Sequence, residues 1–123
     1  MKIPAAESQV MEALWAAGEL TPEQLIAAVA PANGWSEPTV RTLINRLLHK
    51  KALVGERRDG QFRYRPLITR ESYVRDESEG FIDRIFDGKL SPLVAHFAEY
   101  REITPDDLSK LKQLIAEIEN EHG

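Results

Sequence analysis

An Asp-Gly pair between two short segments is the feature that most constrains how this chain folds. Asp59-Gly60 supplies the positive φ angles that a tight type I′ turn requires. The segment before it, 53–58, and the segment after it, 61–66, have the length of hairpin strands, and the second alternates aromatic residues with arginines. The pair therefore predicts a β-hairpin with one aromatic face and one cationic face.

Two short helices are predicted in the first 30 residues. Apolar residues at helical spacing favour a helix over 5–17, and Gly18 is expected to cap its end. The second helix is expected to begin at Thr21, since threonine, proline and glutamine follow in the order of a capping box. It is predicted to end near residue 30, because Pro31 cannot donate a backbone hydrogen bond.

A third helix, with two well-separated faces, is predicted over about 37–51, with Ser36 as its cap. One arc of about 140° is apolar and is expected to pack inside, at 100° per residue. It contains Val40, Leu43, Ile44, Leu47 and Leu48. The remaining surface has hydrogen-bonding groups and no carboxylate, which a merely solvated face usually includes. It contains Thr39, Arg41, Thr42, Asn45, Arg46 and His49.

The charges of the chain are unevenly distributed. The net charge is −4, but residues 1–66 have 9 basic and 7 acidic side chains, whereas 67–123 have 7 and 13. Residues 37–66 alone have 8 basic and 3 acidic side chains. This stretch is able to attract phosphate, and an ordinary solvated surface is the alternative interpretation.

The second half is predicted to form three helices, over about 69–87, 91–101 and from 104 onward. Because some fifty residues are marginal for an independent core, we expect their apolar faces to pack against a second copy of the chain. A compact bundle within one chain is the alternative. The expected dimer contacts are Phe81, Ile82, Ile85, Phe86, Leu93, Phe97, Leu108, Leu111, Leu114 and Ile115.

The composition excludes several classes of protein. There is no cysteine and there are only three isolated histidines, so neither a metal site nor a cofactor is predicted. The chain has no apolar run of the roughly 20 residues that span a bilayer and no signal-peptide core, so we expect a cytoplasmic protein without membrane insertion. Catalytic residue sets and glycine-rich phosphate loops are absent, so no enzymatic activity is predicted.

Three helices followed by a basic hairpin have the order of a winged helix-turn-helix. We therefore predict a mainly α protein, with a winged helix-turn-helix domain at 1–68 and a three-helix dimerisation domain at 69–123. The third helix is expected to enter the major groove of DNA, and the hairpin to follow the backbone as a wing. The predicted DNA contacts are Thr39, Arg41, Thr42, Asn45, Arg46, Lys50, Arg57, Arg58 and Arg63, with Arg46 favoured for phosphate.

The chain also resembles the penicillinase repressor (BlaI/MecI) family over nearly its whole length. The resembling segments are 7–15 (ESQVMEALW), Trp35-Ser36, 39–47 (TVRTLINRL), Lys50-Lys51 and 64–66 (YRP). The resemblance implies a homodimeric repressor whose paired winged helices bind an operator with dyad symmetry, and whose C-terminal helices interlock.

Departures from the family pattern affect what the resemblance implies. Ala52 stands where the family usually has glycine, and the cysteine cluster of copper-responsive relatives is missing. The resemblance also implies a regulatory protease as a partner. The family members that a membrane sensor protease controls are cut between Asn and Phe in the fifth helix. Here His96 precedes Phe97, so release by proteolysis and release by a ligand are both left open.

A different kind of function fits the same fold. Winged helices also serve as protein-interaction modules without sequence-specific DNA binding, because a fold does not fix a function. The two alternatives differ in whether arginine removal changes a salt-dependent affinity for DNA.

Overall fold

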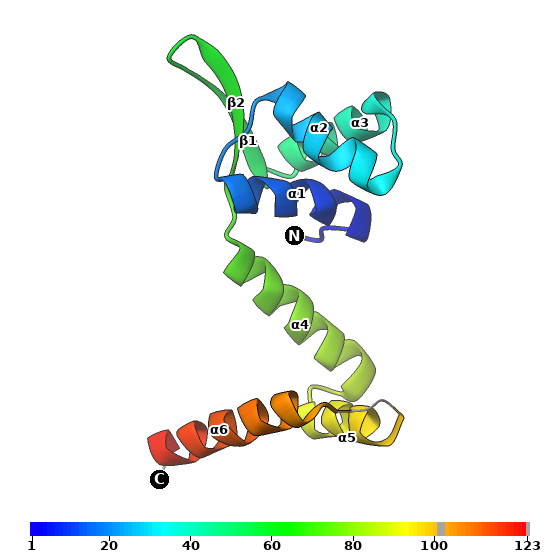
Figure 1. Cartoon of the computed structure of the whole chain (residues 1–123), viewed down its shortest axis with the longest axis vertical. Coiled ribbons are helices and arrows are strands. Elements are labelled where there is room, and N and C mark those ends of the chain that lie inside the picture. The colour runs from blue at the N-terminus through cyan, green and yellow to red at the C-terminus, as the bar shows by residue number, and fades with distance from the viewer. Residues whose placement is uncertain (101–102, 123) are drawn as a thin grey trace. The chain divides into compact units, whose positions relative to one another are not determined.

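The chain divides into two units, Met1–Arg75 and Asp76–Gly123. Figure 1 shows the computed structural model, which describes residues 1–100 and 103–122. The first unit contains three helices and a hairpin, and α4 runs across the boundary between the units.

The first unit is built from α1 (Ala5–Ala17), α2 (Pro22–Asn33), α3 (Glu37–His49), β1 (Leu53–Arg58) and β2 (Gln61–Pro66). The apolar faces of its three helices meet in one core, to which the start of β1 adds Leu53. The fully buried side chains include Val10, Met11, Leu14, Leu25, Val40 and Leu47. In Figure 1 the hairpin projects beyond the helices as a wing, so the predicted winged helix-turn-helix is confirmed.

The C-terminal end of α1 and the start of α2 follow the predicted signals. Gly18, at φ 87°, donates its N–H to the carbonyl of Leu14 and ends α1. The Thr21 hydroxyl accepts from the N–H of Gln24 at 3.2 Å, while the Gln24 side chain accepts from the Thr21 N–H at 3.0 Å. This capping box satisfies two backbone donors that a helix start otherwise leaves unpaired.

The predicted stop at Pro31 is wrong. The second helix continues through Pro31 to Asn33 and ends at Gly34, which has φ 67°. Proline costs an internal hydrogen bond, but its fixed φ is helical, and the carbonyls of this last turn find other donors. The Trp35 N–H donates to Ala30 and the Asn33 side-chain amide to Val29, each at 2.9 Å.

The third helix is two residues shorter than predicted and ends at His49. Lys51 adopts φ 63°, the left-handed conformation that glycine usually supplies after a helix. The Lys51 N–H donates to Leu48 and the Ala52 N–H to Leu47, which is the hydrogen-bond pattern of a Schellman cap. The turn therefore closes normally even though Ala52, which is fully buried, replaces the family's glycine.

The hairpin forms from the two predicted segments, joined by the predicted two-residue turn. Asp59 and Gly60 have φ 54° and 75°, as a type I′ turn requires. Phe62 pairs with Arg57, and its ring lies over Gly55, where any β-carbon would collide with it. Glycine at this position thus leaves room for the aromatic face of the wing.

The second unit is helical and has no fully buried residue in its described part. It contains most of α4 (Arg70–Phe86), together with α5 (Leu90–Tyr100) and α6 (Pro105–His122). The hydroxyls of Thr69 and Thr104 cap α4 and α6. The predicted end of the fifth helix at Arg101 lies outside the described residues.

Candidate nucleic-acid interface

The outer face of α3 is exposed along its whole length. Val40, Leu43, Ile44 and Leu47 are buried, while Thr39, Arg41, Thr42, Asn45, Arg46 and His49 are exposed. The separation of the two faces is therefore as predicted. A shallow depression of about 350 Å³ lies on this face. It is lined by Lys50 and by four of the exposed residues, Thr42, Asn45, Arg46 and His49.

Several polar groups at the start of α3 already have partners inside the protein. The Arg41 guanidinium donates to the Glu37 carboxylate at 2.8 Å, and this hydrogen bond raises the pKa of Arg41. The Thr42 hydroxyl donates to the carbonyl of Pro38, and the Thr39 hydroxyl shares a hydrogen bond with Ser36, each at 3.0 Å. Glu37 thus offsets the charge of Arg41. Glu37 was not among the residues predicted for this face.

Lys50, a predicted DNA contact, is bound to α1. Its ammonium donates to the Glu7 carboxylate at 2.5 Å and to the carbonyl of Lys2 at 3.0 Å. Glu7 is only 3% exposed, so the pair neutralises a carboxylate inside the fold. A role for Lys50 at DNA stays a prediction, and the structure adds a role in holding α1 to α3.

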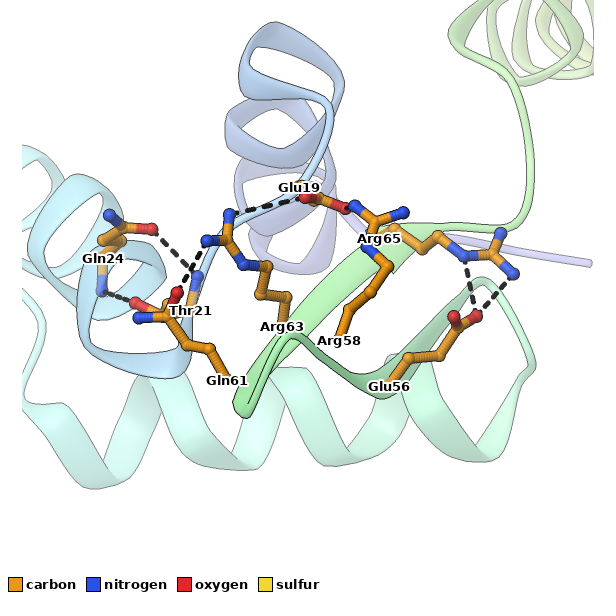
Figure 2. Close-up of polar contacts among 8 residues, drawn as sticks. All are labelled: Glu19, Thr21, Gln24, Glu56, Arg58, Gln61, Arg63 and Arg65. Atoms are coloured by element: carbon orange, nitrogen blue, oxygen red, sulfur yellow. Dashed lines mark hydrogen bonds and ion pairs between the residues drawn. The ribbon is translucent and has the colours of Figure 1, made fainter.

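The arginines of the wing divide between its two faces. Arg58 and Arg63 both bind the Glu19 carboxylate, and Arg65 binds Glu56 at 2.6 Å (Figure 2). Arg57 belongs to the opposite face, because it pairs with Phe62. The predicted cationic face exists, but two carboxylates within the protein offset most of the charge of its three arginines.

Three cations of the 37–66 stretch have no ion-pair or hydrogen-bond partner among the described residues. They are Arg46, Lys51 and Arg57, and all three are exposed. Lys51 was not among the predicted DNA contacts. The available positive charge lies on α3, just after α3 and on the wing.

The tryptophans pack against the core. The Trp15 indole donates to the carbonyl of Ile68 at 2.9 Å and lies 5.3 Å from the ring of Tyr73. Trp35 and Tyr64 are partly buried against the helices. These rings are therefore occupied and are not free for base stacking.

The second unit exposes the apolar side chains that were predicted to form a dimer. Phe81, Ile85, Leu108, Leu114 and Ile115 are 41–56% exposed. Ile82, Phe86, Leu93, Phe97 and Leu111 are half-buried. A groove of about 580 Å³ runs between α5 and α6, lined mainly by apolar residues that include Leu93, Leu111 and Leu114.

The residues that the structure describes include neither a metal-ligand cluster nor a membrane-spanning helix. Across 1–100 and 103–122, no three or more His, Asp or Glu side chains gather as metal ligands. Within the same ranges no helix combines the length and hydropathy needed to cross a bilayer.

The fold and the exposed α3 face define a winged helix-turn-helix protein. The penicillinase repressor family model matches residues 3–117, so the chain belongs to this family of DNA-binding transcriptional repressors, which are not enzymes. The resemblance seen in the sequence is confirmed.

Individual relatives agree with this assignment. The penicillinase repressor of Bacillus licheniformis is 28% identical over 119 residues, which are 97% of this chain and 93% of that protein. The methicillin resistance regulatory protein MecI of Staphylococcus aureus (strain N315) is 28% identical over 115 residues, 93% of each. The solution structure of the DNA-binding domain of the repressor BlaI is 31% identical with a TM-score of 0.50, and the match covers 58% of this chain and 92% of that one.

Proposed function

We propose that the chain is a homodimeric, cytoplasmic repressor that binds a DNA operator with dyad symmetry. In this proposal residues 1–68 bind DNA and residues 69–123 form the dimer. The observation that carries it is the exposed, carboxylate-free strip of α3 from Thr39 to His49, which presents an unpaired Arg46 in a member of a repressor family. A helix surface of this kind fits the major groove.

Two of the three unpaired cations, Arg46 and Arg57, are proposed as the main phosphate contacts. Arg46 acts from α3, and Arg57 from the wing, where it adds affinity more than discrimination. Arg41, Arg58 and Arg63 contribute only when they leave their carboxylate partners. Thr39, Thr42 and Asn45 are proposed to contact base edges or phosphates beside Arg46.

The exposed apolar faces of α4, α5 and α6 support the dimer. Burial of an apolar surface stabilises association by about 25 cal/mol per Å², and the second unit leaves several large side chains half-exposed or more. A patch of this kind marks an interaction site. Two copies place two recognition helices on one duplex, with half-sites about one helical turn, or a small multiple of it, apart.

Proteolytic release remains one proposed route of induction. The bond between His96 and Phe97 lies inside α5, whereas proteases cut exposed, flexible segments most readily. A regulatory protease therefore needs local opening of α5 before it cuts. Release by a ligand needs no such opening.

The experiment is DNA binding measured against salt concentration. Fragments selected from genomic DNA by the purified protein provide the operator, and fluorescence anisotropy gives the affinity. Arg46→Gln and Arg57→Gln are each expected to flatten the slope of log affinity against log salt by about one unit, because each removes one phosphate contact.

Lys89→Gln is the matched control, because it removes one exposed positive charge outside the first unit. Its slope is expected to equal that of the unchanged protein. A protein that selects no DNA fragment is instead a protein-interaction module, and the proposed function is then wrong.

A further inference from the structure

Glu19 is held beside the wing by the backbone. It lies in the connection between α1 and α2, next to Leu20, which exchanges two backbone hydrogen bonds with Tyr64 of β2 at 3.0 and 2.8 Å. Because neighbouring residues of an extended segment point to opposite faces, Glu19 projects on the face of Arg63, not on that of Tyr64. The backbone of Glu19 is therefore held beside the wing independently of the contacts of its side chain.

The single carboxylate of Glu19 binds two arginines of the wing. Its Oε1 accepts from Arg63 at 3.4 Å, and its Oε2 accepts from Arg58. A second Arg63 nitrogen donates to the Gln61 side chain at 2.6 Å. Figure 2 shows both guanidinium groups converging on Glu19 from neighbouring strands.

We infer that Glu19 occupies the place of a DNA phosphate and thereby sets the affinity of the repressor for DNA. This inference rests on the proposed function. A guanidinium fork binds carboxylate and phosphate oxygens with the same geometry, so the two anions compete for Arg58 and Arg63. Duplex DNA presents its charges at close spacing, so phosphates are available along the path of the wing.

Replacing the Glu19 carboxylate by a DNA phosphate costs little free energy, because the ion pairs are exposed to water. The Arg58 and Arg63 side chains are 59% and 37% exposed, and ion pairs of this kind contribute little to stability. Each phosphate contact of Arg58 or Arg63 must therefore first replace a contact with Glu19. Because of this competition, the affinity of the chain for DNA is lower than its wing arginines alone allow.

The test is Glu19→Gln in the full chain, measured by fluorescence anisotropy on the genomic fragment that the unchanged protein binds most tightly. We expect a three- to tenfold tighter affinity near 150 mM salt and a salt slope steeper by about one unit, since the carboxylate that competes with phosphate for Arg58 and Arg63 is removed. Glu12→Gln is the matched control, because Glu12 forms a similar exposed pair with Arg70, outside α3 and the wing. Its affinity is expected to change less than twofold.

A double-mutant cycle separates competition from a general charge effect. In an Arg58→Gln, Arg63→Gln background, Glu19→Gln is expected to change the affinity less than twofold. If the gain persists in that background, or if Glu19→Gln alone leaves the affinity unchanged or weakens it, the inference is wrong. If the unchanged protein binds no fragment, the proposed function fails, and the inference fails with it.

Discussion

At the scale of single residues, the most unusual backbone conformation near the candidate interface is that of Lys51. It adopts φ 63° directly after α3, and a side chain in the left-handed region costs roughly 1–2 kcal/mol. The sequence did not predict this conformation, because the family's glycine is expected at position 52 and the helix was expected to include Lys51. In the structure α3 ends at His49, and the Ala52 N–H donates to Leu47 across the left-handed Lys51.

Lys51→Gly is expected to stabilise the first unit. Glycine adopts this conformation without strain, so the free energy of unfolding should rise by about 0.5–1 kcal/mol, measured by urea denaturation. Lys51→Ala is the control, because it removes the charge and keeps the β-carbon. If both variants shift the stability equally, the gain comes from charge removal and not from relief of the backbone.

At the scale of elements, sequence patterns predicted every helix of the described residues and both strands, though not every helix end, because their signals are local. Thr21 and Gln24 are three residues apart, and Asp59 and Gly60 are adjacent. Ion pairs between elements could not be predicted in this way. Glu7 and Lys50 are 43 residues apart in sequence, so their contact exists only after α1 and α3 have packed together.

The Glu7–Lys50 pair is expected to stabilise the packing of α1 on α3. Lys50→Met leaves the Glu7 carboxylate buried without a cation, so the free energy of unfolding should fall by about 2 kcal/mol. This value is below that of a fully buried pair, because the Lys50 side chain is 30% exposed. Urea denaturation measures the loss.

A second variant identifies the cause of that loss. Glu7→Gln combined with Lys50→Met removes both charges and should recover at least half of the stability. Equal stability of the single and double variants contradicts the assignment, because the loss then comes from packing of the lysine chain. If Lys50 does not contact phosphate, the slope of log DNA affinity against log salt should be the same in the double variant as in the unchanged protein.

At the scale of the whole molecule, the chain combines a basic stretch at 37–66 with an acidic second half. The sequence predicted this division of charge, but not how much of the positive charge is compensated by Glu7, Glu19, Glu37 and Glu56. A single winged helix with few unpaired cations binds DNA modestly. Linking two copies makes the second contact intramolecular, which can raise the affinity by about 10²–10⁴-fold.

Ile115→Asp tests this dependence on a second copy. Ile115 is 54% exposed in the single chain, so the substitution should leave the protomer folded while it places a charge in the proposed apolar interface. We expect monomers by sedimentation and a loss of operator affinity of about 100-fold or more. Ser109→Asp introduces the same charge on the side of α6 opposite the centre of its apolar stripe, about 120° from Ile115 at 100° per residue, and should remain dimeric with unchanged affinity. A monomeric Ile115→Asp variant that keeps full affinity shows that one winged helix is sufficient, whereas a dimeric one places the interface on a different surface.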